Sequence, residues 1–261
     1  MSTIDFGRHS TDYATHRPGF PSSFYDLVES HFDLSDLRVL DIATGPGVVA
    51  LELAKRGANV VGIDIAPGQI EAARERARET GLVDRVTFEV ARGESYEAPA
   101  QSFDLITAGQ CWRWFDPDVT LPHFMKLLKP GGGLVIAHFD YIVQRSVIAR
   151  RTEELILKHN PTWSLSSEKG LYPHYIDQVI TQGFDFIKQV CYDHKQEFTH
   201  ESWRGRIRTC NGVGSGGLPP AGVEQFDHEL HELLKIDFPD EPLRIWHRVW
   251  AVLAKKPELD S

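Results

Sequence analysis

Four residues near the beginning of the chain have the types and spacing of a cofactor site. Asp41 ends an apolar run, and Gly45 and Gly47 follow it in a short turn that leads into a helical pattern. Asp64 ends a second apolar run. Glycines let a backbone turn tightly and approach a ligand, and a carboxylate at the end of the second strand can accept hydrogen bonds from both ribose hydroxyls. The pattern predicts a nucleotide-type cofactor on the first two strands of a parallel α/β sheet.

The glycines alone do not select the cofactor. Gly45, Gly47 and Ala50 fit the dinucleotide pattern G-x-G-x-x-G/A, so NAD and FAD compete with S-adenosylmethionine. Asp41 favours S-adenosylmethionine, because a carboxylate can receive the ammonium of an amino-acid moiety but would repel a pyrophosphate. Asp64 serves either cofactor, because both contain a ribose. The sequence Leu-Lys-Pro-Gly-Gly at 128–132 also bears on S-adenosylmethionine.

Strand and helix patterns alternate along the first half of the chain, which predicts a parallel sheet with right-handed crossovers. The predicted strands there are 38–42, 59–65, 86–91, 103–108 and 133–139, and the predicted helices are 48–56, 69–80 and one that ends near 128 with Pro122 close to its start. Further along, helices are predicted at 148–159, 201–209 and 223–235, and strands at 184–198 and 244–254. The stretch 160–175 is predicted to be irregular.

Several segments together resemble the class I S-adenosylmethionine-dependent methyltransferases, in the small-molecule group that includes trans-aconitate and related carboxyl methyltransferases. They include Val-Leu-Asp-Ile-Ala-Thr-Gly-Pro-Gly at 39–47 and Gly-Gln-Cys-Trp-Arg-Trp-Phe-Asp at 109–116, with shorter matches at 13–21, 62–65, 102–105 and 127–132. The resemblance covers residues 6–142. It implies S-adenosylmethionine as the cofactor and S-adenosylhomocysteine as the product.

The resemblance implies a fold and a domain organisation. The expected fold is α/β, a doubly wound, Rossmann-like, seven-stranded methyltransferase sheet with an inserted, mostly helical cap. Residues 1–142 would form an N-terminal lid and the cofactor-binding half. Residues 143–182 and 199–240 would be substrate cap insertions, and 183–198 and 241–256 the last strands of the same sheet. The whole would be effectively one domain.

The resemblance also implies a set of cofactor-binding residues. They are Tyr13, Arg17, Asp41, Ala43, Gly45, Gly47, Asp64, Ile65, Gly93, Glu94 and Gln110. The first aspartate, its glycine turn and the glutamine would line the methionine end, and Asp64 would hold the ribose. Ile65, Gly93 and Glu94 would surround the adenine, and the two N-terminal residues would fold over the cofactor. Ala43, Arg92 and Arg113 depart from the family, which usually has glycine, often aspartate and often histidine at these three positions.

Acceptor contacts are predicted in an aromatic, cationic cluster and in the cap. Trp112 and Arg113 are expected to face a substrate pocket, whereas core packing accounts for Trp114 and Phe115. An arginine can hold a carboxylate through two parallel hydrogen bonds, although a solvated salt bridge is the simpler interpretation of Arg113. His138, at the carboxyl end of a predicted strand, is either a catalytic contact or a hydrogen-bonded structural histidine.

Two aromatic residues of the predicted cap, Trp163 and Tyr172, are expected to line the substrate pocket or to form an aromatic core. Three arginines at 204, 206 and 208 are interpreted as a solvated helix face. No metal-ligand spacing and no Gly-x-Ser-x-Gly elbow occurs in the sequence. This composition suits methyl transfer, in which alignment and exclusion of water do most of the work.

Composition limits the function classes. The chain has 261 residues, 28 basic and 37 acidic, with a net charge of −9, which argues against a nucleic-acid binder. No apolar run is long enough to span a bilayer and no signal peptide is evident, so we expect a cytoplasmic protein without a membrane partner. Three widely spaced cysteines are expected to be reduced thiols. The sequence gives no oligomeric state.

The expected function is methyl transfer from S-adenosylmethionine to a small organic acceptor, with a carboxylate oxygen as the favoured target. Arg113 and His138 are the candidate catalytic residues. Methylation of nitrogen, carbon or a phenol oxygen is the first alternative. An NAD(P)-dependent oxidoreductase and a catalytically silent cofactor-binding protein are the alternatives from other classes.

Overall fold

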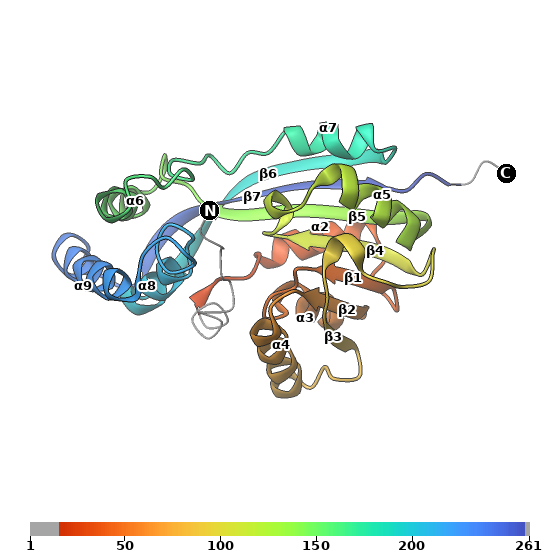
Figure 1. Ribbon diagram of the computed structural model, residues 1–261, viewed down its shortest axis with the longest axis horizontal. Helices are drawn as coiled ribbons and strands as arrows, with labels where there is room; N and C mark the ends of the chain where they lie inside the picture. The colour runs from red at the N-terminus through yellow and green to blue at the C-terminus, as the bar shows by residue number, and fades with distance from the viewer. Residues whose placement is uncertain (1–15, 259–261) are drawn as a thin grey trace. The chain divides into compact units, whose positions relative to one another are not determined.

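The computed structural model describes residues 16–258, and its central feature is a seven-stranded sheet in the order β3-β2-β1-β4-β5-β7-β6 (Figure 1). The strands are β1 (Arg38–Ile42), β2 (Asn59–Asp64), β3 (Val86–Val90), β4 (Phe103–Gly109), β5 (Leu128–Tyr141), β6 (Asp185–Phe198) and β7 (Leu243–Lys255). Strands β1 to β5 pair in parallel. Strand β7 runs antiparallel to β5, because hydrogen bonds join residue 131 to 256 and residue 142 to 246. The predicted Rossmann-like α/β sheet is confirmed.

Helices connect the strands and begin or end at identifiable signals. They are α2 (Ser22–His31), α3 (Val48–Lys55), α4 (Pro67–Thr80), α5 (Pro117–Leu127), α6 (Val147–His159), α7 (His174–Thr181), α8 (His200–Arg208) and α9 (Pro220–Asp237), with short 3-10 turns η1 (Gly93–Ser95) and η2 (Trp112–Trp114). Helix α4 starts with proline in its first turn and ends at Gly81, whose φ of 69° forms a left-handed cap. Thr199 and Ser202 form a reciprocal capping box on α8.

Alternation along the strands creates two apolar layers, one on each face of the sheet. Neighbouring residues of β1, Val39 and Leu40, belong to different core clusters. One cluster packs the sheet against α2, α3 and α4, and the other packs it against α5 and α7. Because both faces of the parallel strands are covered, these strands appear in the sequence as continuous apolar runs.

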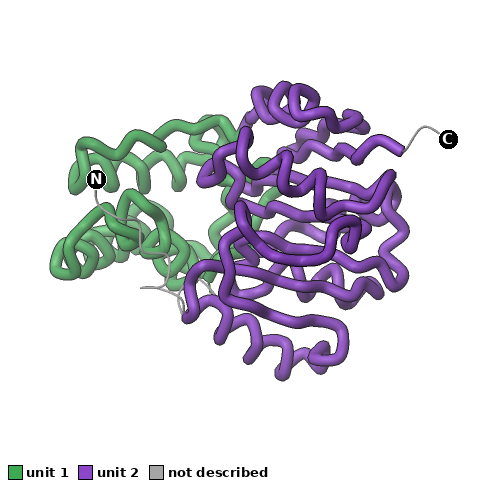
Figure 2. The backbone as a smooth tube through the Cα atoms, turned by 45° about the vertical axis from the view of Figure 1, so that its right-hand side comes forward, with its two compact units in different colours: residues 1–18, 140–170, 193–248 green, residues 19–139, 171–192, 249–261 purple. Residues whose placement is uncertain are grey.

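The chain divides into two compact units (Figure 2). Unit 2 contains residues 19–139, 171–192 and 249–261, and unit 1 contains 1–18, 140–170 and 193–248. Strands β5, β6 and β7 therefore have residues in both units. The cap expected at 143–182 is divided, because α7 packs with the sheet through Tyr175 and Val179. The effectively single domain stays a prediction.

Unit 1 has a core of its own. It is built from one face each of α6, α8 and α9, with Trp203 and Phe226 fully buried. The beginning of β7 contributes Ile245 to the same cluster. The inserted segments are thus mostly helical, as the sequence predicts.

Local boundaries differ from the prediction in three places. Pro122 lies inside α5 and not near its start, because Asp116 caps the helix and Pro117 occupies its first position. Strand β5 begins at Leu128, whereas the predicted strand begins at residue 133. Helix α7 begins at His174, within a stretch predicted to be irregular.

Candidate functional site

Asp41 lies at the carboxyl end of β1. It is buried, with 1% of its surface exposed, and both of its carboxylate oxygens accept hydrogen bonds. Oδ2 accepts a hydrogen bond from the Thr44 hydroxyl at 2.5 Å, and Oδ1 accepts one from the Thr107 hydroxyl at 2.6 Å. Burial raises the pKa of Asp41 to about 6, although the hydroxyls of Thr107 and Thr44 oppose this shift. A cationic ligand group beside Asp41 would favour the ionised carboxylate.

The turn after β1 uses left-handed backbone conformations to reach α3. Ala43, Gly45 and Gly47 have φ values of 47°, 55° and 76°. Gly47 also needs its missing side chain, because a Cβ there would lie 2.9 Å from Cζ of Phe88. Ala43 tolerates a conformation that costs a non-glycine residue about 1–2 kcal/mol, which explains why glycine is the usual choice there.

Asp64 lies at the end of β2 and faces the same turn. Its Oδ2 accepts the Gly45 backbone N–H at 3.0 Å, and its Oδ1 accepts the Ala66 N–H at 2.9 Å. Burial raises the pKa of Asp64, and these backbone hydrogen bonds lower it. The carboxylate is thus fixed against the glycine turn, and each oxygen retains a lone pair for a ribose hydroxyl.

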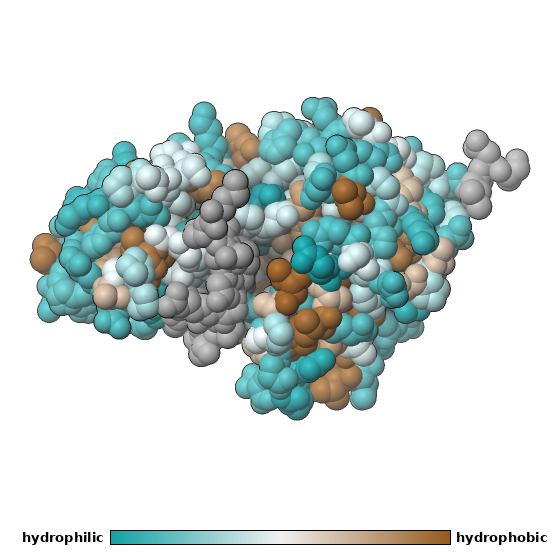
Figure 3. Space-filling model, in the orientation of Figure 1, coloured by the Kyte–Doolittle hydropathy of each residue, from teal (hydrophilic) through white to brown (hydrophobic). Residues whose placement is uncertain are grey.

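Ile65, next to Asp64, is an exposed apolar residue. Its relative exposure is 58%, and Val90 and Trp114 in the same unit are 53% and 43% exposed. Figure 3 shows apolar residues gathered in patches on an otherwise hydrophilic face. An apolar side chain at the end of β2 offers a surface on which an adenine ring can lie.

Residues after β3 and β4 complete this edge of the sheet. Gly93 is buried, and a Cβ there would lie 2.8 Å from Cε1 of Phe115, so only glycine fits without rearrangement. Glu94 is half-buried in η1, and Arg92 before it is exposed. Gln110 has a φ of 65°, and its side-chain amide donates a hydrogen bond to the Phe139 carbonyl at 2.5 Å. Parallel strands place these residues at the edge where open α/β sheets bind ligands.

The aromatic cluster after β4 differs from the sequence prediction. Trp112 is 1% exposed and donates its indole N–H to Oε1 of Gln178 at 2.9 Å, so it packs in the core of unit 2. Trp114, expected in the core, is 43% exposed. The sequence could not tell the two apart, because the turn η2 directs side chains two residues apart in different directions.

Arg113, Tyr172 and His138 come together within unit 2. The Arg113 guanidinium donates to the Tyr172 hydroxyl at 2.7 Å and lies 5.6 Å from the centre of its ring. The ring of His138 lies 4.2 Å from that of Tyr172, centroid to centroid. His138 is 1% exposed, at the carboxyl half of β5. Three of the predicted acceptor contacts therefore form one aromatic, basic cluster.

Other predicted residues lie elsewhere. Tyr13 is outside the described residues. Arg17 lies in unit 1, where its Nε donates to the Thr209 hydroxyl at 3.1 Å. Trp163 also lies in unit 1 and donates its indole N–H to Asn211 at 3.0 Å.

Sequence reasoning missed the two threonines that hold Asp41. Thr107 is paired directly with Asp41 in the β1–β4 register. A polar residue in the apolar run of 103–108 was the available signal, because a buried hydroxyl needs a partner. Thr44 lies inside the glycine turn, three residues after Asp41.

The comparisons with known proteins bear on residues 39–132. This segment matches the family described as "Methyltransferase domain". The matched segment contains both aspartates and the glycine turn, and Gly93, Glu94, Gln110 and Arg113.

Two curated relatives show the range of acceptors. A ubiquinone/menaquinone biosynthesis C-methyltransferase of Geobacter sulfurreducens is 33% identical over 55% of this chain and 57% of its own length. A ubiquinone biosynthesis O-methyltransferase of Histophilus somni is 29% identical over 68% of this chain and 76% of its own length. The chain spans about half the length of the first curated relatives it matches, 47% and 57%.

Solved structures share the fold. A Haemonchus contortus phosphoethanolamine N-methyltransferase, in complex with phosphomonomethylethanolamine and S-adenosylhomocysteine, has a TM-score of 0.59 and 19% identity, covering 99% of this chain and 61% of that chain. The [4+2]-cyclase SpnF has a TM-score of 0.59 and 20% identity, covering 94% and 84%. The fold thus supports more than one kind of chemistry, so the reaction must be argued from the site.

The residues at this edge fit S-adenosylmethionine. Asp41 would accept the ammonium and Asp64 the ribose hydroxyls, and Ile65 is exposed and would contact the adenine. Within residues 16–258, no group of three His, Cys, Asp or Glu side chains is arranged to hold a metal ion. No helix in the described part of the chain is long and apolar enough to cross a bilayer.

Proposed function

We propose that the chain transfers a methyl group from S-adenosylmethionine to a small organic acceptor, and that the acceptor atom is a carboxylate oxygen. Arg113 supports a carboxylate acceptor, although related carboxyl methyltransferases often have histidine at this position. Its guanidinium donates a hydrogen bond to Tyr172, and its position follows directly from a cofactor-binding strand. A guanidinium is a planar group that can hold a carboxylate in a bidentate pair.

Bound S-adenosylmethionine supplies a methyl group already activated on a sulfonium. The new bond joins the methyl carbon to the acceptor oxygen, while the electron pair of the carbon–sulfur bond stays with sulfur. A carboxylate is already ionised at neutral pH and needs no general base. The chain's residues therefore act by holding the two molecules in line and by excluding water. Arg113 would orient the acceptor, and His138 would be a polar contact on it.

Cofactor binding is tested first. Calorimetric titration with S-adenosylhomocysteine should show binding that NAD and NADP do not show, and Asp64→Ala should weaken it about 10–100-fold, because a hydrogen-bonded ribose contact is lost. Asp36→Ala, an exposed aspartate in the same unit, serves as the matched control. Binding of a nicotinamide cofactor in place of S-adenosylhomocysteine would contradict the proposal.

Acceptor chemistry is tested by screening carboxylic acids, phenols and amines for production of S-adenosylhomocysteine. We expect turnover with acids, and a raised KM with little change in kcat for Arg113→Ala. Arg85→Ala is the control, because Arg85 is a surface arginine of the same unit that pairs with Asp36. Turnover of amines or phenols alone would support the alternative acceptors, and cofactor binding without any turnover would support a silent binding protein.

A further inference from the structure

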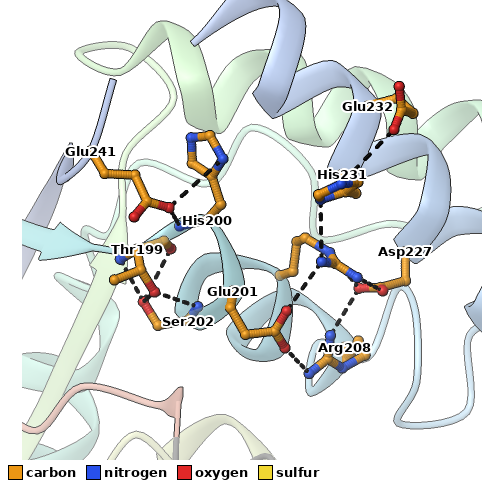
Figure 4. Close-up of polar contacts among 10 residues, drawn as sticks. Thr199, His200, Glu201, Ser202, Arg208, Asp227, His231, Glu232 and Glu241 are labelled. Carbon is orange, nitrogen blue, oxygen red and sulfur yellow. Dashed lines mark hydrogen bonds and ion pairs between the residues drawn. The ribbon is translucent and has the colours of Figure 1, made fainter. Parts of the chain in front are cut away.

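Helix α8 in unit 1 carries three arginines, and one of them is unlike the other two. Arg204 and Arg208 lie one turn apart on the same face and share the carboxylate of Asp227 (Figure 4). Both also pair with Glu201, at 3.1 and 3.0 Å. These two therefore form an ion-paired helix face and not the solvated face that the sequence predicts, because their side chains are only 18% and 17% exposed.

Arg206 lies on the opposite face of the helix and is buried, with 4% of its surface exposed. This corrects the interpretation of all three arginines as a solvated face. The guanidinium lies 4.6 Å from the centre of the Tyr141 ring and 5.7 Å from that of Trp203. Its environment is thus aromatic, and a guanidinium keeps its charge at any ordinary pH.

The charge of Arg206 has no carboxylate partner among the described residues. Its Nη1 donates to the sulfur of Cys210 at 3.2 Å, which is a weak acceptor, and its buried Nε has no hydrogen-bond partner. Burying a cation in this way is unfavourable unless an anion pairs with it.

Glu153 interacts electrostatically with Arg206: burial raises the pKa of Glu153, and the charge of Arg206 opposes this shift. Its Oε2 accepts the Ser167 backbone N–H at 2.7 Å, and it shares a hydrogen bond with the Tyr141 hydroxyl. No ion pair within 4.0 Å joins Glu153 to Arg206 in the described structure. Glu153 therefore interacts with Arg206 at longer range and forms no direct ion pair with it.

We propose that Arg206 is the anchor of a carboxylate-binding site in unit 1, walled by the rings of Tyr141 and Trp203. The ligand class is a small organic acid with an apolar or aromatic body, because the carboxylate would pair with the guanidinium and the body would contact the rings. The acid binds within unit 1 without reacting, so this proposal does not rest on the proposed function.

The test uses benzoate as the probe and benzamide as its neutral isostere, on the full chain without cofactor. Benzoate should raise the thermal midpoint and change tryptophan emission, because Trp203 lies beside the guanidinium, whereas benzamide and sodium chloride of equal ionic strength should do neither. Arg206→Met should abolish the response to benzoate, and Arg204→Met, whose charge is already paired, should keep it.

Stability separates a binding role from a structural one. Arg206→Met removes a buried charge that has no direct anionic partner. Without ligand, the variant should therefore unfold at the same temperature as wild type or at a higher one. Replacing a residue that serves binding commonly has this effect. If Arg206→Met does not fold, Arg206→Lys is measured in its place. It keeps the charge but loses the fork, and should bind benzoate about tenfold more weakly or worse.

Each outcome is decisive for the proposal. Equal benzoate responses in wild type and Arg206→Met or Arg206→Lys would overturn it, and so would the absence of any response in wild type. A failure of methyl transfer leaves the binding result standing.

Discussion

The buried carboxyl of Asp41 makes a quantitative prediction about stability. Burial raises its pKa from 3.8 to about 6, and a tenfold difference in proton affinity corresponds to about 1.4 kcal/mol. The folded state therefore binds this proton more tightly than the unfolded state. The favourable contribution is complete below pH 3.8, and it is lost as the pH rises through 6. Ionised Asp41 should cost folding about 3 kcal/mol at pH 7, relative to acid pH.

Asp41→Asn removes this cost and keeps the shape of the side chain. The hydroxyls of Thr44 and Thr107 can rotate, so one of them can accept a hydrogen bond from the new amide. Urea unfolding from pH 4 to pH 8 should show the variant gaining stability relative to wild type as the pH rises, by up to about 3 kcal/mol. Asp36→Asn, at an exposed and ion-paired position, is the control.

The same carboxyl predicts the pH dependence of cofactor binding. An ammonium beside Asp41 favours its ionised form, so S-adenosylhomocysteine should bind more weakly as the pH falls below about 6, by up to tenfold per pH unit. Asp41→Asn should bind weakly at every pH. A stability difference that does not change with pH, or a variant that is less stable at pH 7, would refute the reasoning about burial.

Close contacts and burial give three further predictions. Gly205→Ala should lower the free energy of unfolding by about 1–3 kcal/mol in urea titrations, because its Cβ would lie 2.1 Å from Cδ2 of His16. In a His16→Ala background the same substitution should instead raise the free energy of unfolding, because alanine favours a helix over glycine. Gly62→Ala should weaken S-adenosylhomocysteine binding and lower stability, because its Cβ would lie 2.6 Å from the Phe88 ring. Adding Phe88→Leu should restore binding in calorimetric titrations. If binding is not restored, the contact with Phe88 is not the cause. Burial, with a smaller effect from Arg206, lowers the pKa of His247 to about 3. The stability that this residue contributes above pH 6.5 should therefore be lost as the pH falls toward 3, by about 1.4 kcal/mol per pH unit. An equally steep loss of stability with falling pH in His247→Gln would contradict this.

The cofactor edge could be predicted from the sequence because its signals are local. The aspartates end apolar runs, and the glycines lie where the chain must turn with positive φ. The spacing of apolar residues and the residue types that favour turns are both set by neighbouring residues. Strands β1 to β4 therefore fall within a residue or two of their predicted bounds. Pro122 shows the limit of this reasoning. It was predicted to lie near the start of its helix, but Asp116 and Pro117 are the stronger helix-start signal.

Burial of individual side chains could not be read in the same way. Trp112 and Trp114 have the same chemistry two positions apart, yet one is buried against α7 and the other is largely exposed. Arg206 differs from Arg204 and Arg208 only in the face of α8 that it occupies. A helix of alternating arginines does not reveal which face meets Tyr141 and Trp203, because the packing of that face depends on other parts of the chain.

The sequence by itself determined the sheet's parallel half, the two aspartates and the glycine turn, and with them the cofactor class. Tertiary structure alone decided that Thr107 of β4 holds Asp41, that α7 packs with the sheet, and that Arg206 is buried among aromatic rings. The physical reason is range. Backbone conformation depends on residues a few positions apart, whereas burial, pKa and unpaired charge depend on contacts between segments that only the fold brings together.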